Sequence, residues 1–327
     1  RGFYVADRFT QVTADDSVIL NVLGKEATGF FVTSGAGTGG EGTNKAGNVT
    51  LTEDAMISLK GENATAMTVD GNYYDLYGNP REVNGKEHTL TIAHSSAQLN
   101  TQNVDTTKGA YGYKLINEGK LIHSGSIDFS DAKDAIGIYV NGGQLENQQG
   151  SKVVVNGVGL DLYQDNKHNL ASIVETEGDI VATDGPAAIR MNENTELTLS
   201  GEGTVEGAGK ADGVLVHKGA ALALNAANNL KVSGTEGSAL HFQTANEAGA
   251  FKLENASGQI LVSGEKGSNV AAITIEGEGA NREGVIGQSD FDSKVLNDIE
   301  ITVEEGRGGH AVVTNLAGTI TIDEKTT

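Results

Sequence analysis

Pairs of carboxylates are the first residues in this sequence whose types and spacing could support catalysis. Three pairs occur: Asp15 with Asp16, Asp131 with Asp134, and Asp290 with Asp292. Two converging carboxylates can hydrolyse a glycosidic bond, one as an acid and the other as a base or nucleophile. Each pair, however, lies in a stretch typical of a loop, and none has a neighbouring Arg or Lys pattern on adjacent coils that would suggest a catalytic cluster. We therefore interpret them as solvated turn residues and predict no catalytic residue.

The histidines and serines give no stronger signal for catalysis or metal binding. Seven histidines are spread along the chain without H-x-H or H-x-x-x-H spacing, so a zinc site would need ligands from separate segments. His217 and His241 could become neighbours in a repeating fold, but two imidazoles do not complete such a site. The G-x-S-x-G nucleophile motif is absent. The calcium-binding G-G-x-G-x-D nonapeptide and the EF-hand loop are absent as well. We expect a non-enzyme without a metal or other cofactor.

Recognition chemistry is concentrated in segment 71–88, which interrupts the pattern described below. This segment holds Tyr73, Tyr74, Tyr77 and Arg81, although the whole chain has only 8 tyrosines. Tyrosine together with arginine is typical of binding hot spots, so these four residues form a candidate ligand-binding loop. The alternative is that the tyrosines cover a flank of the core. Two further interruptions are expected near 35–47 and 276–297, by default as protruding loops.

The elements that must position these residues recur about every 25 residues. Six short runs share a register: 112–115 (GYKL), 137–140 (GIYV), 159–162 (GLDL), 188–191 (AIRM), 213–216 (GVLV) and 239–242 (ALHF). We treat as equivalent Leu115, Ile138, Leu162, Met191, Val216 and Phe242, which gives steps of 23, 24, 29, 25 and 26 residues. Such a period indicates a unit that buries its apolar face only by stacking on copies of itself.

The runs predict short β-strands separated by turns. Alternating apolar residues mark strands at 153–155, 197–199, 222–224, 260–262, 273–275 and 299–303. Long helical patterns and a leucine-rich repeat signature are absent, so a parallel β-helix is favoured. The 45 glycines and only 2 prolines suit its corners. We predict an all-β single domain over 1–327 with roughly 13 coils and a length of about 60 Å.

A strand that points one residue inward must point its neighbours outward, which predicts two exposed columns. The first is Lys114, Gly137, Asp161, Arg190, Leu215 and His241; the second is Ile116, Tyr139, Tyr163, Asn192, His217 and Gln243. Aromatic rings beside polar donors could bind a linear glycan or an extended peptide. The candidate ligand-binding face comprises Lys114, Tyr139, Tyr163, Arg190, Asn192, His217 and His241. The alternative is that such residues simply suit exposed strands.

Composition narrows the classes of partner. The formal net charge is −21, from 44 acidic and 23 basic residues, which disfavours binding to nucleic acid and to anionic membranes. The simplest role of this charge is to keep an elongated surface soluble. There is no cysteine, and no apolar run approaches the ~20 residues of a membrane-spanning helix. The first residues do not match a signal peptide, and we expect both flanks of the natural protein to lie outside this sequence.

The chain resembles the passenger domain of a Gram-negative autotransporter. The likeness rests on cysteine-free, acidic, Gly- and Asn-rich coils with phrases such as 135–140 (AIGIYV), 142–145 (GGQL), 187–191 (AAIRM) and 219–224 (GAALAL). The resemblance implies a right-handed, three-faced parallel β-helix displayed on the bacterial cell surface or secreted. It also implies export through a C-terminal outer-membrane barrel that is not in this sequence. Such a barrel would be the protein's only link to a membrane. The G-D-S-G motif of protease passengers is missing, which leaves similarity to AIDA-type and glycosaminoglycan- or fibronectin-binding adhesins.

The expected function is therefore a non-catalytic adhesin that binds a host glycan such as a glycosaminoglycan, or a matrix protein such as fibronectin. Two alternatives stay open. Copies on different cells could associate with each other and promote aggregation and biofilm. Parallel β-helices also serve as polysaccharide lyases and hydrolases, which is the third possibility.

Overall fold

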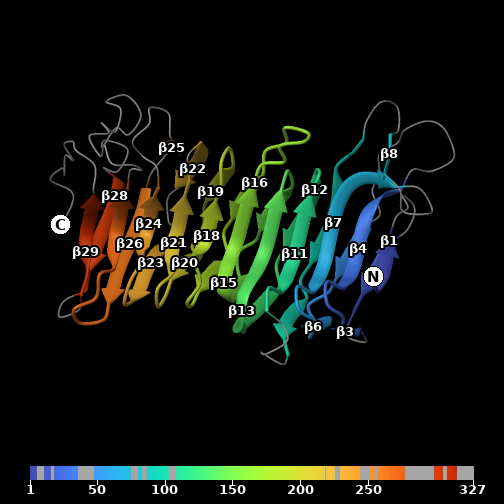
Figure 1. Ribbon diagram of the computed structural model, residues 1–327, viewed down its shortest axis with the longest axis horizontal. Helices are drawn as coiled ribbons and strands as arrows, with labels where there is room; N and C mark the ends of the chain where they lie inside the picture. The colour runs from blue at the N-terminus through green and yellow to red at the C-terminus, as the bar shows by residue number, and fades with distance from the viewer. Residues whose placement is uncertain are drawn as a thin grey trace.

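The computed structural model describes residues 1–5, 11–15, 18–35, 48–74, 80–82, 87–102, 108–217, 219–224, 229–243, 251–254, 257–276, 298–304 and 308–314. Within these residues the chain is all-β, without a helix, and its strands stack as parallel rungs along the long axis (Figure 1). Each complete turn of the chain visits three faces. The predicted three-faced parallel β-helix is confirmed. No described helix could span a membrane.

Face 1 is the longest column and has eleven rungs within the described residues. Its strands are β1 (Phe3–Val5), β4 (Thr28–Gly35), β7 (Thr65–Tyr74), β11 (Tyr111–Ile116), the second halves of β13 (Ser126–Asn141) and β15 (Lys152–Tyr163), β18 (Ala187–Met191), β21 (Asp212–Val216), β24 (Ser238–Phe242), β27 (Ala271–Ile275) and β29 (His310–Thr314). At about 4.8 Å per rung, the ten steps span about 48 Å.

Faces 2 and 3 complete each coil. Face 2 contains β3 (Ile19–Val22), β6 (Met56–Leu59), β10 (Gln98–Thr101), the first halves of β13 and β15, β17 (Asp179–Ala182), β20 (Thr204–Gly207), β23 (Asn229–Gly234), β26 (Ser257–Gly264) and β28 (Asp298–Val303). Face 3 contains β2 (Gln11–Ala14), β5 (Asn48–Leu51), β9 (Thr91–Ser95), β12 (Gly119–His123), β14 (Gln144–Asn147), β16 (Ile173–Thr176), β19 (Glu196–Leu199), β22 (Ala220–Leu224) and β25 (Phe251–Glu254).

The register on face 1 corrects one predicted equivalence. Leu115 lies opposite Val140, and Val140 lies opposite Leu162, so Ile138 does not belong to this column. Ile138 instead lies between Tyr113 and Leu160, one inward position earlier on the strand. Both positions point inward, because residues two apart share one side of a strand. Alternation alone could not decide between them.

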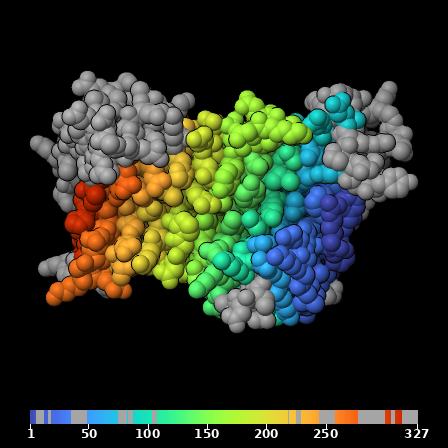
Figure 2. Space-filling model, viewed as in Figure 1, coloured from blue at the N-terminus to red at the C-terminus, as the bar shows by residue number. Residues whose placement is uncertain are grey.

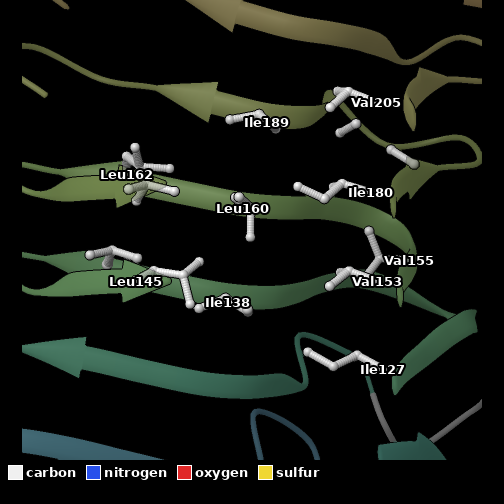
Figure 3. Close-up of a cluster of buried hydrophobic side chains, with 14 of the residues drawn as sticks. Ile127, Ile138, Leu145, Val153, Val155, Leu160, Leu162, Ile180, Ile189 and Val205 are labelled. Carbon is white, nitrogen blue, oxygen red and sulfur yellow. The ribbon is translucent and has the colours of Figure 1, made fainter. Parts of the chain in front are cut away.

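The interior consists of stacked columns of aliphatic side chains. Figure 3 shows Ile138, Leu160 and Ile189 from three successive rungs among the buried side chains between the strands. All three are 0% exposed. Burying one such side chain contributes about 1.5–3 kcal/mol, and each is covered by its counterparts on the adjacent rungs. Stacking therefore provides the core that no single coil could form.

One interior column beneath face 3 is polar. His123 lies opposite Ser95 and Asn147 on neighbouring rungs, and a 2.7 Å hydrogen bond joins His123 Nδ1 and Asn147 Oδ1. Asn147 Nδ2 in turn donates to Thr176 Oγ1 at 2.8 Å. Burial lowers the pKa of the His123 imidazole to about 4, although the hydrogen bond to Asn147 Oδ1 acts in the opposite direction. This histidine is a neutral structural residue.

Two excursions leave the coils near one another. From Tyr163, the last residue of β15, to the residue before β16 the chain forms a loop, here called loop 163–172, in which Asp165 and Leu170 exchange two backbone hydrogen bonds of 2.9 and 3.1 Å. Figures 1 and 2 show it as a yellow-green projection. In segment 71–88, β7 continues to Tyr74 and pairs antiparallel with β8 (Pro80–Arg81). The interruptions predicted near 35–47 and 276–297 lie almost entirely outside the described residues.

Candidate ligand-binding face

Face 1 carries a continuous outward column between its two inward ones. It passes through Lys114, Tyr139, Asp161, Arg190, Leu215 and His241, which lie opposite one another on successive rungs. Tyr139 therefore takes the place predicted for Gly137, which is buried. In the second column Asn141, and not Tyr139, lies between Ile116 and Tyr163. Both changes follow from the corrected position of Val140.

Three tyrosines form a strip across adjacent rungs, here called the tyrosine strip: Tyr111, Tyr139 and Tyr163. The ring centroids of Tyr111 and Tyr139 are 6.2 Å apart with perpendicular planes, and those of Tyr139 and Tyr163 are 5.4 Å apart with a tilt of 35°. All three side chains are partly exposed. Burial, followed by the charge of Asp161, raises the pKa of Tyr139 to about 12. Its hydroxyl thus stays protonated and able to donate a hydrogen bond.

Lys114 lies at one end of the strip. Its ammonium nitrogen is 3.6 Å from the centroid of the Tyr111 ring, in cation–π contact. Partial burial lowers the pKa of this lysine. Lys114 therefore packs on the strip and does not project as a free charge.

Arg190 is paired with a buried aspartate at the other end of the strip. Arg190 Nε donates to Asp161 Oδ1 at 2.8 Å, and Nη2 donates to Oδ2 at 2.6 Å. Asp161 is 1% exposed. Arg190 Nη2 also lies 3.4 Å from the Tyr163 hydroxyl oxygen. The predicted donor to a ligand carboxylate or sulfate is thus already neutralised, and it orients Tyr163.

A recess of about 330 Å³ opens beside Tyr163, where the face 1 strands turn toward face 3. It is lined by Tyr163, Gln164, Asn166, Asn192, Glu193 and His217, whose side chains all carry a polar group. Asn192 Nδ2 donates to the Leu162 carbonyl oxygen at 2.8 Å, which fixes the direction of its amide. Burial, and then the nearby Arg190 and His241, lower the pKa of His217. The structure thus brings together Tyr139, Tyr163, Arg190, Asn192 and His217.

His241 lies further along face 1 and bridges two carboxylates. Its Nδ1 is 2.7 Å from Asp212 Oδ2, and its Nε2 is 3.3 Å from Glu276 Oε2. Burial opposes protonation, but the bond to Asp212 and the charge of Glu276 outweigh it, so the net pKa of His241 is raised. His241 is engaged in the protein's own ion pairs.

The tyrosines of the predicted binding loop are largely used inside the protein. Tyr73 is 6% exposed, and the Tyr74 hydroxyl donates to Asp70 Oδ2 at 2.7 Å. The alternative interpretation, that they cover the core, therefore holds for Tyr73. Tyr77 lies outside the described residues, and for Arg81 the structure describes only backbone pairing with Tyr73.

The acidic pairs singled out in the sequence are described only in part by the structure. Asp131 is exposed, and Asp134 is paired with Lys108 at 3.1 Å. Asp16, Asp290 and Asp292 lie outside the described residues. A second recess, of about 210 Å³ on face 3, is lined by Glu146, Asn147, Gln148, Glu175 and Glu177. In the part of the chain that the structure describes, no three His, Asp or Glu side chains are placed to hold a metal ion.

Sequence reasoning missed Tyr111 and the role of Asp161. Tyr111 has the same parity as the fully buried Tyr113, yet it is partly exposed. The intervening Gly112 is buried like Tyr113, so strict alternation fails between these two residues of β11, and this glycine is the signal that could have revealed it. The Asp161 to Arg190 pair could have been inferred from their equivalent places in neighbouring repeats.

Comparison with known proteins adds no relative: no family model, curated protein or solved structure gives a significant match to this chain.

Proposed function

We propose that this chain is a non-catalytic, surface-displayed binding domain of the adhesin type, and that its tyrosine strip binds a glycan. The observation that carries the proposal is the side-by-side placement of Tyr111, Tyr139 and Tyr163 on three parallel rungs. Partly exposed rings offer flat apolar faces to sugar rings, while their hydroxyls and the neighbouring amides offer hydrogen bonds. Display on a bacterial surface rests on the resemblance to autotransporter passengers.

A glycan suits this face better than an extended peptide does. Peptides commonly bind β-proteins by adding a strand to an open sheet edge. The strands that carry the strip, β11, β13 and β15, are each paired with a rung on both sides. Their backbone groups are therefore occupied, and side chains alone must make the contacts. A matrix protein such as fibronectin is the competing ligand in the test.

The test is binding of the purified chain to a glycan array and to immobilised fibronectin. Tyr139→Ala and Tyr163→Ala should each weaken glycan binding about tenfold, the effect of losing one aromatic contact of about 1.4 kcal/mol. Tyr4→Ala is the matched control, because Tyr4 is a 40% exposed aromatic residue in the same outward column, four rungs away. Unchanged glycan binding by both strip variants, or binding to fibronectin alone, would refute the proposal.

Self-association and polysaccharide cleavage are separated by two further measurements. Homotypic clumping of cells that display the chain needs no added ligand, and it should strengthen with salt because the rods carry like charge. Cleavage would release reducing sugar or an unsaturated product from pectin, alginate or chondroitin. The proposal predicts neither clumping nor product release.

A further inference from the structure

We infer that the recess beside Tyr163 is a subsite for one neutral, hydroxyl-bearing sugar unit of the bound glycan. This inference rests on the proposed function and adds the chemical class of the ligand: a neutral glycan is favoured, and sulfated or uronate-rich glycans are disfavoured.

The recess is preorganised on the side formed by loop 163–172. Gln164 Nε2 donates to Asn169 Oδ1 at 2.8 Å, and Asn194 Nδ2 donates to Gln164 Oε1 at 2.8 Å. The Gln164 amide is thereby held from both ends. A wall with fixed donors and acceptors loses less entropy on binding than a free loop does.

The same loop is tied to the segment around residue 87. The His168 imidazole lies between two carboxylates, with Nδ1 bonded to Asp165 Oδ2 and Nε2 2.8 Å from Glu87 Oε2. Lys167 Nζ also contacts Glu87, at 3.3 Å. Contacts across 80 or more residues of sequence thus hold this wall in place.

Every cationic side chain described near the recess is already paired with the protein's own carboxylates. Arg190 is bound to Asp161, Lys167 to Glu87, and His241 lies between Asp212 and Glu276. The fourth basic side chain, His217, has a lowered pKa and is neutral. Glu193, which lines the recess, is exposed and has no ion pair among the described residues.

Among the described residues, a sulfate or carboxylate in this recess would therefore meet the exposed carboxylate of Glu193 and no unpaired cation. Burial of an anion without a partner is strongly unfavourable. A sugar hydroxyl, which both donates and accepts, matches the amides of Gln164 and Asn192 and the neutral imidazole of His217. Tyr163 can stack against the sugar ring. The net charge of −21 acts in the same direction at longer range.

The experiment is calorimetric titration of the intact chain with neutral hexasaccharides from glucan, mannan and galactan, and with heparin and chondroitin sulfate. Titrations are run at about 0.05 M NaCl, where surface charges still interact, and at about 0.5 M NaCl, where their interactions are largely screened. A neutral hexasaccharide should bind with less than about a twofold change between the two salt concentrations, and the sulfated chains should not bind. His217→Ala and Asn192→Ala should each weaken this binding about tenfold. Gln148→Ala, in the face 3 recess, should leave it unchanged, and unfolding curves verify that each variant is folded.

The outcomes separate this inference from the proposed function. Binding of heparin or chondroitin sulfate that is lost in His217→Ala would overturn the neutral assignment while the glycan-binding function stands. Neutral binding that depends on Tyr139 but not on His217 or Asn192 would confine the site to the strip and overturn the subsite. Absence of binding to every glycan would refute the subsite and the proposed function together.

Discussion

Arg190 and Asp161 lie opposite each other on neighbouring rungs of face 1 and are joined by two parallel hydrogen bonds, of 2.8 and 2.6 Å. The aspartate is buried, and the arginine side chain is 25% exposed. The pair thus closes the surface over the core and neutralises the arginine that lies next to the tyrosine strip. Under the proposed function, recognition on this face would therefore depend chiefly on rings, hydroxyls and amides.

Removing only the arginine should destabilise the fold. Arg190→Met leaves Asp161 as a buried, unpaired carboxylate, and we expect the free energy of unfolding to fall by about 3 kcal/mol. Urea denaturation followed by circular dichroism measures it. The double variant Asp161→Leu with Arg190→Met should recover most of the loss, because no uncompensated charge remains. A loss below about 1 kcal/mol in the single variant would contradict a buried pair.

The buried His123 should make stability depend on pH. Its folded pKa is about 4, whereas its ordinary value is 6.5, so the unfolded chain binds a proton that the folded chain excludes. The full free energy of unfolding is therefore present above about pH 6.5. As the pH falls toward 4, protonation of the unfolded chain lowers it by about 3 kcal/mol in all. Thermal unfolding of His123→Asn should show a correspondingly flatter decline over this range. His94→Asn, an exposed histidine on the neighbouring rung, should behave like the original chain.

His241 should have the opposite pH dependence. Its pKa is raised in the folded state by Asp212 and Glu276 despite burial, so the folded chain binds the proton more tightly. This stabilisation is present below the unfolded pKa and is lost as the pH rises through the folded pKa. His241→Gln should therefore reduce stability by about 2 kcal/mol at acidic pH and by less at alkaline pH. An equal loss across the whole range would show that the imidazole is not charged.

The contact between Glu87 and loop 163–172 should protect the loop. Lys167 is exposed within it, so trypsin cleavage after this residue reports how often the loop opens. Glu87→Gln weakens the bonds to His168 and Lys167, and we expect cleavage to become roughly three- to fivefold faster. Glu196→Gln, at an exposed site on face 3, serves as the control. Equal cleavage rates in all three proteins would mean that the contact does not hold the loop.

Gly137 should tolerate no side chain. A Cβ at this position would lie 2.5 Å from Val153 Cγ1 and 2.6 Å from the Gly159 carbonyl oxygen on the next rung. Gly137→Ala must push rungs apart, and we expect a loss of about 2 kcal/mol or more in unfolding free energy. Gly24→Ala, whose nearest neighbour would be the Ala27 Cβ at 3.3 Å, should lose much less. Similar losses in the two variants would contradict the close packing of face 1 rungs.

The fold could be predicted from the sequence because the same alternation of apolar and polar residues recurs in coil after coil. Alternation in segments such as 153–155 and 273–275 places strands correctly. The pairing of Leu115 with Val140 was missed because the inward positions at 138 and 140 satisfy the pattern equally well. Only the neighbouring rungs select one of them, since a shift would displace all contacts along the column.

The candidate site was predicted only in part, because its chemistry arises between rungs. Residue types suggested Arg190 as a free donor, but its partner Asp161 comes from the preceding coil, 29 positions earlier. Tyr111 was overlooked because Gly112 and Tyr113 are both buried, which breaks the parity rule. Loop 163–172 contains turn-forming residues such as Asp165 and Asn166, but its anchor, Glu87, is distant in sequence.

Hydroxyl-radical footprinting of the intact chain, with and without a saturating neutral hexasaccharide, tests the ligand-binding face most directly. The account predicts that oxidation of Tyr139, Tyr163 and His217 decreases severalfold on binding, while that of Tyr4 and of the exposed Ile173 on face 3 stays unchanged. Protection confined to face 3, or bound glycan with no protection of the two tyrosines, would contradict it.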